Sequence, residues 1–220
     1  LVNSLLNSVR CIVSDIPGTT RDAIDTRLNI NNKDFLLIDT AGIKRKGKTQ
    51  KVLDKFSVIM SLKALDRCDI AVIIVDVTEG ITDQDVTIAG YAYERGRGCI
   101  IVVNKWDLVK PLDVTKKLFE EKIKDKCKFL DFAPIMFLSA MTGYNLDSLL
   151  PEVELVYEEY RKKISTGRLN DCIEKAIERN PLPNYRGNYV KIKYTTQIRS
   201  RPPSIKCFIN YPEGVHFSYK

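Results

Sequence analysis

Residues 99–107 join an apolar run to a polar tetrapeptide: Cys99-Ile100-Ile101-Val102-Val103 is followed directly by Asn104-Lys105-Trp106-Asp107. An unbroken apolar run of this length, rich in β-branched residues, is typical of a strand buried on both faces in a parallel sheet. Ligands of open α/β sheets gather outside the carboxyl ends of the strands. The tetrapeptide is therefore predicted to lie at a binding site.

Three further apolar runs of strand length also end on a polar residue. They are 35–38 before Asp39, 70–75 before Asp76, and 135–138 before Ser139. We expect all four strands to be buried in one sheet, so that four strand ends meet at one site.

Helical patterns separate these runs. Leu146, Leu149, Leu150, Val153, Val156, Tyr157 and Tyr160 recur at spacings of three and four, which predicts a helix over 145–163. Amphipathic helices are also predicted over 83–95 and 113–126. Alternating strands and helices predict an α/β fold with a doubly wound, mostly parallel sheet.

The tetrapeptide 104–107 has the residue types needed to recognise guanine. An Asp at the position of Asp107 can accept hydrogen bonds from N1–H and the exocyclic amine of guanine, a donor pair that adenine lacks. Asn104 would tie neighbouring loops together and reach the base, and the stem of Lys105 can lie over the base plane. Ser139-Ala140, after the last strand, can offer a backbone N–H to the guanine O6. Alone, each motif also fits an ordinary turn.

Two segments nearer the N-terminus have the residue types of a γ-phosphate sensor. In Asp39-Thr40-Ala41-Gly42, Asp39 can orient a water on Mg²⁺, and the Gly42 N–H can bond the γ-phosphate. In the loop Pro17–Asp22, Thr20 is our choice for a Mg²⁺ ligand that binds only when γ-phosphate is present. The four motifs occur in the order Thr loop, Asp-x-x-Gly, Asn-Lys-x-Asp and Ser-Ala, and three of them follow buried strands. We put the chance of a purely structural coincidence of the whole set below roughly 5%.

With these motifs, the chain resembles the Der (EngA) family of ribosome-assembly GTPases. The resemblance rests on four stretches, which are 14–22, 39–43, 165–170 and 190–197. It implies a second GTPase domain, without its phosphate-binding loop, over 1–164 and a C-terminally incomplete, small α+β KH-like domain over 165–220. It also implies that an N-terminal GTPase domain precedes them in the intact protein.

The sequence departs from the usual GTPase pattern at two points. It contains no Gly-x-x-x-x-Gly-Lys-[Ser/Thr] loop, so we expect it to begin just after that loop and to be inactive as given. Ile43 stands where many GTPases place a water-orienting glutamine. Relatives with an apolar residue here use potassium, which implies a K⁺ ion held by the backbone of Ser14 and Ile16.

The resemblance and the motifs together define the expected site. We expect Thr20, Asp39 and Gly42 to serve catalysis, and Thr20 and Asp39, the latter through water, to hold Mg²⁺. GTP or GDP is expected to contact Asp39, Thr40, Ala41, Gly42, Ile43, Asn104, Lys105, Trp106, Asp107, Ser139 and Ala140.

Charge is concentrated in the last quarter of the chain. Residues 165–220 hold 10 Lys+Arg against 4 Asp+Glu, a net +6, out of +7 for the whole chain. The segment has no Gly-x-x-Gly RNA clamp. Contact with ribosomal RNA is favoured over plain solubility for the basic group as a whole. The candidate phosphate contacts are Arg186, Lys191, Lys193, Arg199, Arg201 and Lys206.

The same segment shows a weaker pattern of secondary structure. Ser165-Thr166-Gly167 is predicted to be a linker, followed by a helix that ends at Asn180 and by strands over 189–195 and 205–210. We expect the aromatic residues in and near these strands to be core residues rather than base-stacking platforms. They are Tyr185, Tyr189, Tyr194 and Phe208.

The leading hypothesis is a GTP-hydrolysing switch in assembly of the large ribosomal subunit, monomeric and binding ribosomal RNA. A non-enzymatic RNA-binding scaffold with a degenerate GTPase fold is the alternative. No apolar run reaches the roughly 18 residues that a membrane span needs. Six cysteines without Cys-x-x-Cys pairs predict free thiols in a reducing compartment. We take this to be the cytoplasm, with an organelle stroma or matrix as the alternative.

Overall fold

The computed structural model describes residues 1–6, 25–30, 32–38, 62–109 and 115–215. The chain divides into two compact units, Leu1–Tyr157 and Glu158–Lys220, and each is described by itself. The sequence-based boundary at 164/165 stays a prediction.

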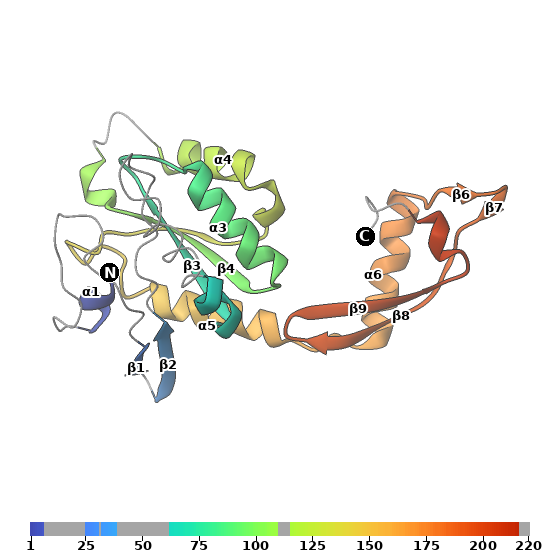
Figure 1. The fold of residues 1–220 in the computed structure, drawn as a ribbon, viewed down its shortest axis with the longest axis horizontal. Coiled ribbons are helices and arrows are strands. Elements are labelled where there is room, and N and C mark those ends of the chain that lie inside the picture. Colours follow the sequence, from blue (N-terminus) through green and yellow to red (C-terminus); the bar gives the residue numbers. More distant parts are fainter. Residues whose placement is uncertain (7–24, 31, 39–61, 110–114, 216–220) are drawn as a thin grey trace. The chain divides into compact units, whose positions relative to one another are not determined.

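A parallel three-stranded sheet organises the first unit. Its strands are β3 (Ile70–Asp76), β4 (Gly98–Asn104) and β5 (Ile135–Phe137), hydrogen-bonded in that order. Helices α3 (Asp83–Glu94) and α4 (Lys116–Lys126) cover one face, and α5 (Leu149–Arg161) covers the other (Figure 1). A helix at 62–67 precedes β3. Helices on both faces of a parallel sheet are the predicted α/β architecture.

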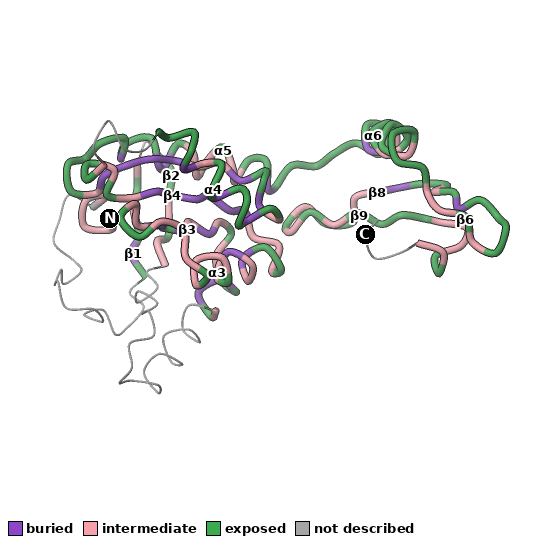
Figure 2. The backbone as a smooth tube through the Cα atoms, turned by 90° about the horizontal axis from the view of Figure 1, so that it is seen from above, coloured by how far each residue is buried: buried purple, intermediate pink, exposed green. Residues whose placement is uncertain are grey.

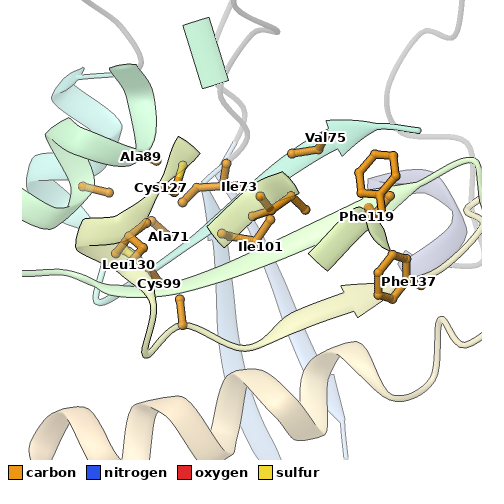
Figure 3. Close-up of a cluster of buried hydrophobic side chains, with 14 of the residues drawn as sticks. Ala71, Ile73, Val75, Ala89, Cys99, Ile101, Phe119, Cys127, Leu130 and Phe137 are labelled. Atoms are coloured by element: carbon orange, nitrogen blue, oxygen red, sulfur yellow. The ribbon is translucent and has the colours of Figure 1, made fainter. Parts of the chain in front are cut away.

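Strand β4 lies at the centre of two apolar cores, as its unbroken apolar run predicts. Cys99, Ile101 and Val103 join the core under α3 and α4, in which Ile73, Phe119 and Phe137 also lie (Figure 3). Ile100 and Val102 point the other way, into a second core that includes Leu149 of α5. Both faces are therefore removed from water, and β4 is buried from Gly98 to Val103 (Figure 2). Each fully buried Val or Ile contributes about 1.5–3 kcal/mol.

The loop between β3 and α3 has a defined path. Asp76 Oδ1 accepts hydrogen bonds from the backbone N–H of Thr78 at 2.9 Å and from its hydroxyl at 2.7 Å. Gly80 adopts a left-handed φ of +67°, which suits a residue without Cβ. Thr82 then caps α3 in a reciprocal capping box with Asp85. These contacts fix the chain immediately after the end of β3.

The strand predicted over 35–38 differs from expectation. It lies in β2 (Lys33–Ile38), which pairs antiparallel with β1 (Asp25–Ile30) and, within the described residues, with no strand of the parallel sheet. Its residues are exposed or half-buried, and Leu36 is 50% exposed. The prediction of a buried parallel strand there is wrong, because a short apolar run does not specify its pairing partner.

The second unit combines one long helix with two hairpins. Helix α6 (Thr166–Arg179) packs on β8 (Ile192–Ser200), which pairs antiparallel with β9 (Pro203–Ile209). The short strands β6 (Asn184–Tyr185) and β7 (Asn188–Tyr189) are joined by Arg186 and Gly187, both at positive φ, as two-residue hairpin turns favour. The predicted linker 165–167 is wrong, because Thr166 and Gly167 already belong to α6.

Burial in this unit also departs from expectation. Tyr189, Tyr194 and Phe208 are 71%, 45% and 43% exposed, so the prediction that they are core residues is wrong. Tyr185 is half-buried, with its ring 6.2 Å from that of Tyr211. Apolar identity alone does not show which face of a two-stranded hairpin is covered.

Candidate functional site

The ends of β3 and β4 bring together side chains from two stretches that are 28 residues apart. Asp76 and Asn104 are direct partners in the parallel register. The backbone N–H of Val77 donates to the Asn104 carbonyl at 3.1 Å, which extends the pairing past the strands. The loops that follow β3 and β4 therefore start side by side at one edge of the sheet.

Asn104 also connects its loop to the one that follows β5. The Asn104 Oδ1 accepts a hydrogen bond from the backbone N–H of Ala140 at 3.0 Å. The backbone N–H of Trp106 donates to the Leu138 carbonyl at 3.1 Å. The predicted tie between loops is thus present in the structure. It holds the 104–107 and 139–140 segments together through the side-chain oxygen of Asn104. The NH₂ group of the same side chain carries two N–H donors that could bond a ligand.

Lys105 is held by Asp76, an acidic residue that the sequence analysis placed at the strand ends but gave no role. Its backbone is left-handed, with φ 62° and ψ 33°, and its Nζ lies 2.7 Å from Asp76 Oδ2. Burial alone would raise the pKa of Asp76, but hydrogen bonds from Lys105 and Thr78 outweigh it and lower that pKa. The same hydrogen bond raises the pKa of Lys105. The ion pair stretches the lysine stem across the strand ends.

Trp106 and Asp107 have different surroundings, one against the core and the other in solvent. The Trp106 ring packs edge-on against Phe137, with centroids 4.5 Å apart, and lies 6.4 Å from Phe119. Trp106 therefore anchors the short 3₁₀ turn Trp106–Leu108 to the core. Asp107, in the same turn, is exposed. A rigidly anchored turn presenting an exposed carboxylate suits recognition of a ligand with paired N–H donors.

Ser139 shapes the loop after β5. It is fully buried, its Oγ accepts the Thr142 N–H at 3.1 Å, and its own N–H donates to the Tyr144 carbonyl at 3.0 Å. The predicted contact between this segment and a base oxygen stays a prediction. The other backbone donor of the segment, the Ala140 N–H, points at Asn104 Oδ1. A ligand oxygen would share or replace that bond.

Helix α1 (Val2–Leu6) lies against the same loop. The hydroxyl of Ser4 donates to the Ala140 carbonyl at 2.7 Å, and Leu1 and Leu5 pack against the core that contains Leu138. The start of the chain thus supports the loop whose backbone N–H faces Asn104.

The remaining predicted site residues lie outside the described residues. These are Ser14, Ile16, Thr20, Asp39, Thr40, Ala41, Gly42 and Ile43. Their expected roles toward GTP, Mg²⁺ and K⁺ stay predictions. Across the part of the chain that the structure describes, no cluster of His, Cys, Asp or Glu forms a metal site, and no helix is both long and apolar enough to cross a bilayer.

Comparison with known proteins gives two family matches in separate parts of the chain. Residues 1–105 match the model described as 50S ribosome-binding GTPase. Residues 163–220 match the KH-domain-like region of EngA bacterial GTPase enzymes, C-terminal. The curated "GTPase Der" of Geotalea daltonii is 50% identical over 220 residues, which are 100% of this chain and 50% of that protein. The chain belongs to the Der/EngA GTPase family.

Other relatives agree with this Der/EngA assignment. The "GTPase Der" of Desulforapulum autotrophicum is 48% identical over 219 residues, covering 100% of this chain and 44% of that protein. The chain therefore spans about half the length of the curated relatives it matches.

Two solved structures of Era have a similar fold. Era in complex with MgGDPNP and part of 16S ribosomal RNA is 30% identical with a TM-score of 0.60, over 69% of this chain and 50% of that one. A variant of Aquifex aeolicus Era bound to GDP·AlF4⁻ is 27% identical with a TM-score of 0.61, over 94% of this chain and 72% of that one. These matches support the predicted GTPase fold.

Proposed function

We propose that this Der/EngA chain is the guanine-recognising and RNA-binding part of a GTP-hydrolysing switch that acts in assembly of the large ribosomal subunit. The observation that supports it most is the bond from Ala140 N–H to Asn104 Oδ1, together with the Lys105–Asp76 ion pair. Both fix loops at the carboxyl ends of adjacent parallel strands, where α/β sheets bind ligands.

In this proposal each described residue has a separate task. Asp107 accepts hydrogen bonds from the guanine N1–H and amine, Asn104 donates its amide to the base, and the Ala140 N–H bonds O6. Lys105, held by Asp76, covers one face of the base. Adenine lacks this pair of N–H donors, so it would leave the Asp107 carboxylate unpaired. The site rejects ATP for this reason.

Hydrolysis belongs to the part of the site that lies outside the described residues. Thr20 and Asp39 are proposed to hold Mg²⁺, which supplies charge stabilisation at the phosphates, and K⁺ bound near Ser14 and Ile16 is proposed to replace the missing glutamine at Ile43. The KH-like unit is proposed to contact ribosomal RNA. Era, a neighbour in fold, is seen with 16S ribosomal RNA. A monomeric state and a cytoplasmic location stay predictions.

The test is nucleotide binding by the full-length protein that contains this chain, in potassium buffer with Mg²⁺. Titration with GTP and with ATP should give at least about 100-fold tighter binding of GTP, since the unpaired carboxylate penalises adenine. Equal affinity for the two nucleotides would contradict the proposed base recognition. Ribosomal particles that bind equally well with and without GTP would contradict the switch.

The scaffold alternative makes the opposite prediction for the first titration. A degenerate GTPase fold would bind neither nucleotide, yet would still bind RNA. The intact ties between the strand-end loops favour the enzyme, because these loops have no need of a shared geometry in a scaffold.

A further inference from the structure

The hairpin of β8 and β9 has one face occupied by α6. Asn170 of α6 accepts hydrogen bonds at its Oδ1 from the Thr195 N–H at 2.8 Å and from the Thr195 hydroxyl at 2.7 Å. Gln197, on the same face two residues further, donates to the Lys162 carbonyl and accepts from the Ile164 N–H. Figure 1 shows α6 next to β8 and β9.

The register assigns the remaining side chains to the opposite face. Successive side chains of a strand point to opposite faces, so Tyr194 and its partner Phe208 point away from α6, as do Thr196 and its partner Lys206. A register shift between Gln197 and Arg199 returns Arg199 to this face, opposite Ser204. We call the set Tyr194, Thr196, Arg199, Ser204, Lys206 and Phe208 the open face.

The open face combines two rings with cationic groups. The Tyr194 and Phe208 ring centroids lie 5.7 Å apart, and both residues are more than 40% exposed. Lys206 Nζ lies 5.0 Å from the centre of the Phe208 ring. Residues 192–209 hold four Lys+Arg and no Asp or Glu. Exposed rings beside cations, with no acid on either strand, complement a polyanion that has flat apolar groups.

We propose that the open face binds single-stranded RNA, with Tyr194 and Phe208 stacking on bases and Lys206 and Arg199 contacting phosphates. The inference rests on the RNA partner of the proposed function and adds where and in what form the RNA binds. A duplex hides its base faces, so a stacking surface selects unpaired strands. A protein partner fits less well, because the charged residues of the open face are Arg199 and Lys206, and neither strand carries an acidic residue that could pair with basic groups of a partner.

The test measures RNA binding by the full-length protein in solution. The probes are a labelled single strand of about 12 nucleotides, within the usual size of such sites, and the matching duplex. The variant Tyr194→Leu/Phe208→Leu removes both rings and keeps apolar volume. Tyr189→Leu is the matched control, since Tyr189 is an exposed aromatic residue of the same unit outside the open face.

The ring-free variant should bind the single strand roughly tenfold or more weakly, whereas the control should bind as the wild type does. Lys206→Gln should instead lower the slope of log affinity against log salt by about 0.7, the value for one phosphate on a single strand. The slope of the ring-free variant should stay unchanged, which separates lost stacking from a general loss of fold.

Two results with the leucine variant and the wild type would overturn the inference. One is single-strand binding by the ring-free variant within twofold of the wild type, which would leave the face to a protein partner. The other is equal wild-type affinity for the duplex. If the leucine variant does not fold, Tyr194→Trp replaces it: its fluorescence should be quenched by the single strand, and absence of quenching sinks the inference. Wild-type protein that binds no RNA would remove the RNA partner of the proposed function as well.

Discussion

Replacement of Asn104 separates loop tethering from base recognition, because one side chain has both tasks. Asn104→Ala deletes the acceptor of the Ala140 N–H, now bonded at 3.0 Å. Loss of one such hydrogen bond lowers the free energy of unfolding by about 0.5–1.5 kcal/mol. The partly buried Ala140 N–H is then left without a partner, which brings the total to about 1–2 kcal/mol. Asn104→Asp keeps an acceptor oxygen in place and removes only the amide donors.

The assay pairs urea unfolding of this 220-residue chain without nucleotide with GDP binding by the full-length protein. Asn104→Ala should lower the free energy of unfolding by about 1–2 kcal/mol and weaken GDP binding. Asn104→Asp should stay within about 0.5 kcal/mol of the wild type in unfolding, yet lose GDP affinity. Wild-type stability of Asn104→Ala, or an equal stability loss in both variants, would refute the tether.

Three further predictions test other parts of the structure. Asp76→Asn should destabilise the chain by less than about 1 kcal/mol at neutral pH, since the pair with Lys105 is partly exposed. Because the pKa of Asp76 is lowered in the folded chain, the ion pair stabilises it fully at pH values above the ordinary pKa of 3.8. The difference in unfolding free energy between variant and wild type should therefore shrink as the pH falls through the lowered pKa. A difference that does not depend on pH would count against the pair. Burial raises the pKa of Cys99 to about 12, so alkylation at pH 8 should modify exposed Cys207 and spare Cys99, and equal labelling by mass spectrometry would contradict the buried strand. Asn170→Ala should destabilise the second unit by about 2–3 kcal/mol, since its acceptor holds two donors of β8; unchanged amide exchange in β8 would contradict this.

The centre of the fold follows directly from sequence, whereas its edges do not. The run Cys99–Val103 is apolar at every position, so only burial on both faces satisfies it. The run 35–38 is shorter, and its pairing in an exposed hairpin depends on segments that local pattern does not describe. Gly167 suggested a linker, but the cost of about 1 kcal/mol for a helical glycine is small against burial of Leu169 in α6.

The candidate site shows the same division. Asn104, Lys105, Asp107 and Ala140 were found from motifs, because base recognition requires these residue types in this order. Asp76 was predicted to lie at the site as one of four strand ends, without a role of its own; its pairing with Lys105, 29 residues later, is a tertiary contact. Its signal was its place at the carboxyl end of a strand next to β4. The functional roles of all these residues stay predictions.

The central claim is that the turn after β4 recognises guanine, and Asp107→Asn tests it most directly. In the full-length protein, nucleotide competition should show preference moving from GTP to xanthosine triphosphate, because the asparagine amide pairs with the xanthine oxygen and no longer accepts from the guanine amine. The GTP-to-xanthosine-triphosphate affinity ratio should fall by about 100-fold or more. An unchanged preference for GTP would contradict the account.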